Sequence, residues 1–307
     1  MRREQQIKAG LIVLLLQRPG SVGSIESGVQ PIALGVADRS IRLAPVRRRN
    51  RQVTAHLIQA TRALLSFCSR RRQTVRHGDG DQRDVSDRGA LFSLDVVFAT
   101  DWFIETYEQL REDMQPYPYD TEPGEVICQV VPSGPGFPDE NNLRLFNSLI
   151  YSAQRRLSIT SPYFVPDDSL LYAITTAAQR GVAVELFVGE QGDQFMVHHA
   201  QCSYYKALLK AGVRIYLYPA PFILHSKHLS VDDEVAVIGS SNMDIRSFNL
   251  DFEISVMCLS RSLTTAMREV EDLYCSLSRE LTLDEWYRRP LGKRYIDNVM
   301  RLTSALQ

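Results

Sequence analysis

A histidine, a lysine and an aspartate stand at fixed spacing ahead of a Gly-Ser turn in the stretch "HSKHLSVDDEVAVIGSSN". The pattern reads H-x-K-x4-D-x6-G-S-x-N and comprises His225, Lys227, Asp232, Ser240 and Asn242. A lysine holds phosphate oxygens, while an imidazole attacks phosphorus or protonates a leaving alcohol. The hydroxyl, amide and backbone N–H groups of such a turn surround an anion. The combined spacing therefore predicts a site that acts on a phosphate ester.

Two strands and a turn are expected to position these groups. Side chains alternate along a strand, so a strand that carries His225 and Lys227 turns both to the same face. We expect a tight turn at residues 231–234 and the partner strand at 235–239. Glu253 lies on the strand after the Gly-Ser turn, where its carboxylate orients the second nitrogen of the histidine ring. A lone His-x-Lys pair is usually solvent-facing, so the prediction depends on the whole pattern.

Alternating strands and helices surround the motif. Gly181 and Gly212 come just past two of the expected helices, where a left-handed cap belongs. The alternation predicts an α/β fold in which helices cover both faces of a sheet. We expect strands at 125–131, 156–160, 182–189 and 213–219, and helices at 91–110, 139–154, 168–180, 200–211, 261–280 and 283–306.

The chain divides into two parts of different composition, although its net charge is only -1. Residues 1–91 hold 17 bases against 7 acids and contain no Trp or Tyr, whereas residues 92–307 hold 18 bases against 29 acids. We expect residues 1–90 to be an atypical Arg-rich segment, disordered or translated from a non-native frame, and residues 91–307 to form the folded domain. The acid excess of that domain disfavours nucleic acid as a partner, because nucleic-acid binding depends on Lys and Arg contacts to phosphates.

Cysteine spacing and hydropathy disfavour several other classes. The five cysteines have no C-x-x-C spacing, so we expect no disulfide framework, no metal and no cofactor, and a reducing compartment. The longest apolar run, Ala9–Leu16, is shorter than the roughly 20 residues that span a bilayer. The amphipathic final helix, with Tyr295 and Leu302, allows contact with a membrane surface or packing on the sheet. We interpret His198 and His199 as surface or packing residues.

The motif resembles the HKD motif of the phospholipase D superfamily, and the wider sequence is similar to bacterial cardiolipin synthases. The resemblance covers roughly Gly89 to Gln307 and includes "SPYFVPDDSLLYAI", "NMDIRSFNLDFEIS" and the tail "TLDEWYRRPLGKR". It implies a phospholipase D-like lobe with a mixed β-sheet flanked by helices on both faces. It also implies a phosphatidyl transfer through a phosphohistidine, in which two phosphatidylglycerol molecules give cardiolipin and glycerol without a metal.

By this resemblance each residue of the site has a role. The second HKD motif consists of His225, Lys227 and Asp232, of which Asp232 shapes the site rather than touching substrate. Lys227, Ser240 and Asn242 bind the substrate phosphate, and Glu253 supports the histidine. The implied partners are phosphatidylglycerol and other anionic phospholipids, at the surface of the cytoplasmic membrane.

The family pattern has two HKD motifs, and only one is present in this sequence. His56 and His77 are not followed by lysine at the second position. We therefore expect impaired transfer by a single chain, or a homodimer in which each copy contributes one His225. Two alternatives remain open: a homodimeric single-HKD phosphodiesterase or nuclease, and a non-catalytic remnant that binds a lipid headgroup. A remnant that does not bind lipid would be cytoplasmic.

Overall fold

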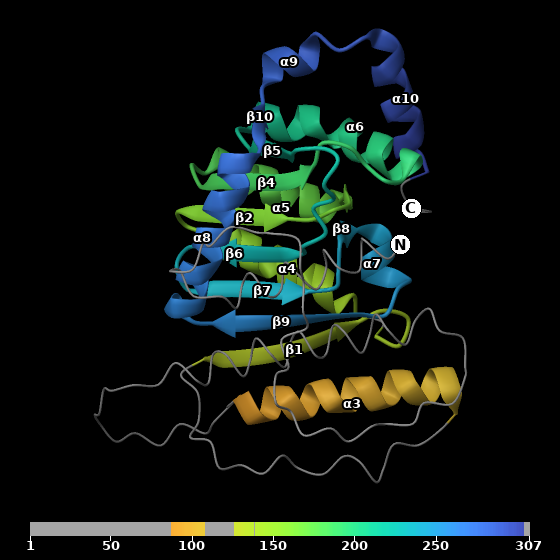
Figure 1. The fold of residues 1–307 in the computed structure, drawn as a ribbon, viewed down its shortest axis with the longest axis vertical. Helices are drawn as coiled ribbons and strands as arrows, with labels where there is room; N and C mark the ends of the chain where they lie inside the picture. Colours follow the sequence, from red (N-terminus) through yellow and green to blue (C-terminus); the bar gives the residue numbers. More distant parts are fainter. Residues whose placement is uncertain (1–86, 108–125, 138, 304–307) are drawn as a thin grey trace, which may run out of the picture.

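An eight-stranded mixed sheet forms the centre of the computed structural model, which describes residues 87–107, 126–137 and 139–303 (Figure 1). Its strand order is β1-β9-β7-β6-β2-β4-β5-β10, in which β2, β4 and β5 run parallel and the other neighbours are antiparallel. A parallel pair, β3 (Phe164–Val165) and β8 (Met243–Asp244), lies apart from this sheet. The strands of the main sheet are β1 (Ile127–Ser133), β2 (Arg156–Thr160), β4 (Ala183–Gly189), β5 (Arg214–Tyr218), β6 (His228–Val231), β7 (Val235–Gly239), β9 (Glu253–Leu259) and β10 (Arg279–Leu281).

Helices cover both faces of the sheet, as the alternation of elements predicts. One face, which includes Leu186 and Val188 of β4, packs with the buried sides of α4, α5 and α6. The intervening Phe187 points to the opposite face and stacks with Tyr216 near Tyr274 of α8. The helices are α3 (Asp87–Thr106), α4 (Asn141–Ser152), α5 (Asp168–Gln179), α6 (Phe195–Ala211), α7 (Ile245–Asn249), α8 (Arg261–Leu277), α9 (Leu283–Tyr287) and α10 (Leu291–Arg301).

Local sequence accounts for several helix ends. The side chains of Asp167 and Ser260 accept hydrogen bonds from backbone N–H groups in the first turns of α5 and α8. Gly181 and Gly212 adopt φ values of 92° and 97° just past α5 and α6, so the expected left-handed caps are confirmed. These caps determine where each helix ends and the chain turns into the next strand of the sheet.

The expected helices differ from the structure at their ends. The helix predicted at 91–110 begins at Asp87 and ends at Thr106. The helix predicted at 261–280 ends at Leu277, because residues 279–281 pair with β5 as the edge strand β10. The helix predicted at 283–306 is divided into α9 and α10, and Pro290, which has no N–H group, is the residue before α10. The helix predicted at 200–211 already begins at Phe195.

The predictions for the Arg-rich segment fall mainly on residues that the structure does not describe. Residues 1–86, including the apolar run Ala9–Leu16, lie outside the described residues, and α3 begins at Asp87. Within the described part of the chain, no helix combines the length and apolar character needed to cross a bilayer.

Candidate active site at the open end of the β6–β7 hairpin

His225 and Lys227 lie on the segment that enters β6. The prediction that both residues belong to a strand is wrong, because β6 begins only at His228 and residues 222–227 have no regular structure. Lys227 still touches the partner strand, since its carbonyl accepts a hydrogen bond from the N–H of Gly239 at 3.2 Å. Its ammonium group folds back to the carbonyl oxygen of His225 at 3.1 Å. The backbone therefore leaves the ladder at Lys227, which brings the ammonium back toward His225.

His228 fixes this segment from inside the protein. Its ring is buried, with Nδ1 3.0 Å from the hydroxyl of Ser226 and Nε2 3.0 Å from the hydroxyl of Thr160. Burial lowers the pKa of His228 to about 4, so the ring is neutral at physiological pH. The contact of 3.7 Å between Nε2 and Glu271 is therefore a polar contact rather than an ion pair. Ser226 stands between His225 and Lys227, so its bond to the buried ring holds both site residues in place.

The Gly-Ser turn ends β7, as predicted, and faces the same open end of the hairpin. A side chain on Gly239 would come within 2.4 Å of the carbonyl oxygen of Ile254, so this position admits no Cβ without a backbone shift. The N–H of Ser240 donates to that same carbonyl at 2.9 Å, and its hydroxyl accepts from the N–H of Ile254 at 3.0 Å. The close approach of β7 to β9 thus carries the turn to the edge where Lys227 lies.

Asn242 is held in a polar layer beneath the turn. Its amide donates to the hydroxyl of Ser247 at 3.3 Å, and the next N–H, of Met243, donates to the hydroxyl of Ser161 at 3.1 Å. The side-chain amide oxygen of Asn242 is buried and has no hydrogen-bond partner among the described residues. The segment "SPYFVP" and the turn therefore form one structure, with the amide of Asn242 close to the site.

Two carboxyl groups flank Lys227. Glu253 begins β9, as expected, and burial raises its pKa to about 7, although the Ser240 hydroxyl and the Lys227 ammonium act against this. Burial also raises the pKa of Asp244 to about 6, against hydrogen bonds from Ser247. Both groups exchange protons near neutral pH, a property that is common at reactive sites. Asp244 was not predicted as a site residue, although its position two residues after Asn242 places it next to the motif.

Asp232 does not share this end of the hairpin. It occupies the β6–β7 turn with φ 49°, at the other end of β6. Its carboxylate accepts backbone N–H groups of Gln154, Arg155 and Arg156 at 3.1, 2.7 and 3.0 Å. These donors outweigh the effect of burial and hold its pKa below the usual value. The structure therefore separates Asp232 from Lys227 and gives it a structural task.

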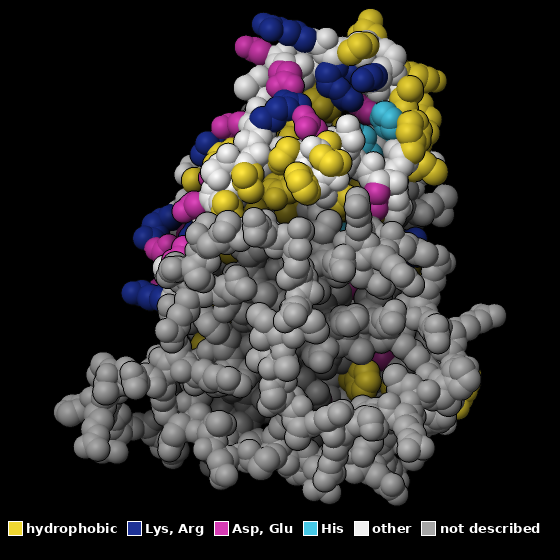
Figure 2. All heavy atoms as spheres, in the orientation of Figure 1, with side chains coloured by type: hydrophobic (Ala, Val, Ile, Leu, Met, Phe, Trp, Pro, Cys, Tyr) yellow, Lys and Arg dark blue, Asp and Glu magenta, His cyan; other side chains and the backbone are white. Residues whose placement is uncertain are grey.

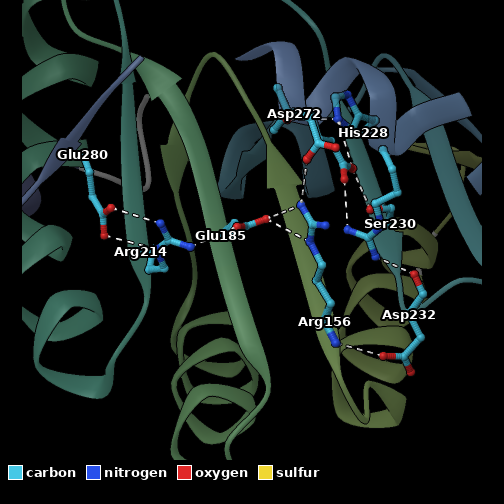
Figure 3. A network of polar contacts seen from close by, with 11 residues as sticks. Arg156, Glu185, Arg214, His228, Ser230, Asp232, Asp272 and Glu280 are labelled. Carbon is cyan, nitrogen blue, oxygen red and sulfur yellow. Dashed lines mark hydrogen bonds and ion pairs between the residues drawn. The ribbon is translucent and has the colours of Figure 1, made fainter. Parts of the chain in front are cut away.

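A chain of charged contacts surrounds Asp232 and crosses the sheet (Figure 3). Arg156 of β2 bonds Glu185 at 2.7 Å, and Glu185 in turn lies 3.5 Å from Arg214. Arg268 of α8 binds both the carboxylate of Glu271 and the carbonyl of Asp232. These contacts tie the closed end of the hairpin to the neighbouring strands and to α8.

Comparison with known proteins shows what this chain is similar to. The family described as "Cardiolipin synthase, PLD-like domain" matches residues 146–273, which contain every predicted site residue. The chain is also similar to proteins named cardiolipin synthase A, so the resemblance inferred from the motif is confirmed.

Two of these relatives illustrate how far the similarity extends. Cardiolipin synthase A of Yersinia pseudotuberculosis serotype O:1b (strain IP 31758) is 38% identical over 217 residues, which is 70% of this chain and 44% of that protein. The protein of the same name from Serratia proteamaculans (strain 568) has the same identity and coverage. The chain thus spans less than half the length of these relatives.

The chain also has some similarity to solved structures. Phosphatidylserine synthase from Haemophilus influenzae Rd KW20 covers 59% of this chain and 48% of its own, with TM-score 0.47 and 17% identity. Nuc from Salmonella typhimurium, a phospholipase D family member, covers 52% of this chain and 99% of its own, with TM-score 0.45 and 22% identity.

Proposed function

We propose that this chain is the second catalytic lobe of a phosphatidyltransferase of the cardiolipin synthase type. A ring nitrogen of His225 attacks the phosphorus of phosphatidylglycerol, and the bond from phosphorus to the glycerol headgroup breaks as an acid protonates the departing oxygen. The terminal hydroxyl of a second phosphatidylglycerol then attacks the phosphohistidine. The phosphorus–nitrogen bond breaks, a proton is lost from the attacking hydroxyl, and cardiolipin results.

The observation that carries this proposal is the meeting of Lys227 with the Gly-Ser turn and Glu253 at one end of the hairpin, next to His225. The carbonyl of Lys227 accepts the N–H of Gly239, and Ser240 exchanges two hydrogen bonds with Ile254, the residue after Glu253, so the three groups share one small region. A phosphate at this edge meets the ammonium of Lys227, the hydroxyl of Ser240 and the amide of Asn242, which are suitable donors for its oxygens. The similarity to cardiolipin synthase A supports phosphatidylglycerol as the substrate.

Glu253 has the properties of a proton carrier in this scheme. Because burial raises its pKa to about 7, it exists in both protonation states at neutral pH. We assign it to the support of His225: its ionised carboxylate accepts the ring N–H and favours the charged imidazole that forms during transfer. While no substrate is bound, the positive charge of Lys227 stabilises the ionised carboxylate of Glu253.

The proposed reaction uses two imidazoles, one as nucleophile and one as acid, and His225 supplies one of them. A second copy of this chain, related by a two-fold axis, would supply the other. In that arrangement each site needs His225 from both copies. Activity in a mixture of wild type and His225→Ala should then fall as the square of the wild-type fraction, rather than in proportion to it.

The test uses purified protein with phosphatidylglycerol vesicles and measures cardiolipin and released glycerol at several protein concentrations. Transfer should vanish in His225→Ala and in Lys227→Met, and should persist in Lys210→Met, which changes an exposed lysine on α6 in the same way. A thermal melt of each variant confirms that it is folded. Transfer by folded His225→Ala at the wild-type rate would refute the proposed nucleophile.

Two substrate arms separate the alternatives. Hydrolysis of a simple phosphodiester or of DNA, with no cardiolipin formed, would indicate a phosphodiesterase or nuclease instead. Unchanged vesicle binding by His225→Ala, together with no turnover by the wild type in any arm, would indicate a lipid-headgroup-binding protein.

A further inference from the structure

The last described helix, α10, exposes several large apolar side chains and buries its acid. Leu291, Tyr295 and Leu302 are 77%, 71% and 85% exposed, and their spacing of four and seven residues places them on one face. Asp297 is only 2% exposed. A surface helix normally has the reverse arrangement, with its apolar face on the core. We call Leu291, Tyr295 and Leu302 the α10 face.

Polar contacts hold α10 in this orientation. One carboxylate oxygen of Asp297 lies 2.7 Å from His199 Nδ1, and the other accepts a hydrogen bond from an Arg289 guanidinium nitrogen at 2.7 Å. Arg289 also stacks on the buried ring of Trp286, with 3.9 Å between the guanidinium carbon and the ring centroid. Turning the α10 face inward would break these pairs and expose the groups that they satisfy. The outward direction of the α10 face is therefore built into the fold. His199 has the packing role that we expected from the sequence.

The segment that carries the α10 face is basic. From Trp286 to Thr303 the sequence has five bases, and its single acid is the buried Asp297. The helical spacing places Arg294 and Arg301 along one flank of the α10 face, where Arg301 is exposed and Arg294 is half-buried. An apolar strip with cations along one flank complements a bilayer that contains anionic lipid, since the apolar groups enter the headgroup boundary and the cations meet the phosphates.

The apolar surface continues from α10 onto the start of α6. Phe195 and Met196 are exposed at the first turn of α6, and the Phe195 ring lies 4.4 Å from that of His199, the partner of Asp297. In Figure 2 hydrophobic side chains gather beside histidines along the edge over α10, with Lys and Arg side chains close by. In Figure 1 this edge is on the side where β7 ends and where β8 and α7 lie, which is the side of the candidate active site.

We propose that the α10 face is a docking surface for a bilayer containing anionic phospholipid. Leu291, Tyr295 and Leu302 enter the interface, while Arg294 and Arg301 contact lipid phosphates. The proposal rests on the proposed function in that the substrate is a lipid of the bilayer. Docking through this edge would bring the open end of the hairpin to the membrane surface, where the headgroups lie.

The test compares binding of the purified full chain to vesicles of phosphatidylcholine and to vesicles with about one third phosphatidylglycerol, by cosedimentation. The variant Leu291→Ser/Tyr295→Ser/Leu302→Ser should lose at least about tenfold in partitioning, because burial of one leucine alone accounts for roughly that factor. The matched control is Leu273→Ser/Tyr172→Ser/Leu277→Ser, which changes two leucines and one tyrosine exposed on α8 and α5. The control should bind as the wild type does. Arg294→Gln/Arg301→Gln should weaken binding only to the anionic vesicles.

Three results would overturn the docking proposal. The first is that the wild type fails to bind anionic vesicles, and the second is that the α10 triple variant binds them as well as the control variant does. The third is a change in molecular mass in solution for the α10 variant with vesicle binding intact, which would show that the face is a protein interface. Failure of the transfer proposal is separate: His225→Ala should bind vesicles normally, and vesicle binding that depends on the α10 face stands even if no cardiolipin is formed.

Discussion

Replacing Asp232 tests whether this residue of the motif acts in chemistry or in folding. The structure assigns it to the closed end of the β6–β7 hairpin, where it accepts three backbone N–H groups from residues 154–156. Its φ of 49° lies in the left-handed region, which asparagine tolerates better than alanine. We therefore expect Asp232→Ala to destabilise the protein strongly and Asp232→Asn to do so weakly.

The size of the effect follows from these contacts. Hydrogen bonds to a carboxylate contribute up to about 3 kcal/mol each when buried, but Asp232 is partly exposed, so about 1 kcal/mol for each is the better figure. Left-handed backbone adds about 1 kcal/mol of strain for alanine. Because the three bonds share one carboxylate and are not additive, we expect a loss of about 3 kcal/mol for Asp232→Ala. Asp232→Asn retains one acceptor oxygen and the backbone preference, so about 1 kcal/mol is expected.

Urea unfolding followed by far-UV circular dichroism measures these losses, and the pH dependence supplies an independent check. The folded-state pKa of Asp232 lies below its unfolded value of about 4. Its contribution is therefore complete above that unfolded value and is lost as the pH falls through the folded-state pKa. Asp232→Asn should remove that part of the acid dependence.

Catalytic assays of the same variants decide between the two roles. If Asp232 only holds the hairpin, Asp232→Asn should keep phosphatidyl transfer within a few-fold of wild type at temperatures where it is folded. A stable Asp232→Asn protein whose transfer falls as far as that of His225→Ala would refute the structural assignment. Equal stability of Asp232→Ala and wild type would refute the energetic argument.

The remaining predictions concern the pKa, the packing and the charges of the described residues. The wild type should lose stability as the pH rises from about 4.5 to about 7, because a buried acid with a raised pKa stabilises the fold only while it is protonated. Glu253→Gln should remove this loss, and urea unfolding midpoints across that pH range measure it. Gly239→Ala should cost about 2 kcal/mol or more in urea unfolding, because its Cβ meets the Ile254 carbonyl, whereas Gly292→Ala, where nothing lies within 4 Å, should not destabilise. Asp297→Ala should lower stability by about 3 kcal/mol, because Arg289 and His199 lose their partner; a loss under about 0.5 kcal/mol would contradict the anchoring of α10.

Periodicity predicted the class of fold because the pattern of buried residues is periodic. Strands β4 and β5 carry apolar residues on both faces, one set toward α4–α6 and one toward α8, and the helices α5 and α6 end at glycine caps. The bounds failed where tertiary pairing decides: "SREL" continues a helical pattern, yet residues 279–281 become an edge strand because β5 offers an open edge. Pro290 is a local signal that predicts the break before α10.

The roles of the candidate site residues stay a prediction, and the structure agrees with only part of the geometry expected for them. Lys227, Ser240 and Glu253 do meet at one end of the sheet, but His225 and Lys227 are not on a strand. The interior groups that hold them could not be inferred, because the roles of His228 and Thr160 depend on the pairing of β6 with β2. Likewise the burial of Asp297 depends on α10 packing against α6, which no local pattern reveals.

The spacing of the motif has a physical explanation in the hairpin. The four residues between Lys227 and Asp232 are the four residues of β6, His228–Val231, and the chain returns along β7 to Gly239. The motif thus describes a hairpin with its aspartate at the closed end and its lysine and Gly-Ser turn at the open end, which the hydrogen bond from Gly239 to Lys227 joins. A change in strand length by one residue would turn the site groups to the other face of the sheet. The fixed spacing therefore reflects the register of two strands more than contact among all the residues it contains.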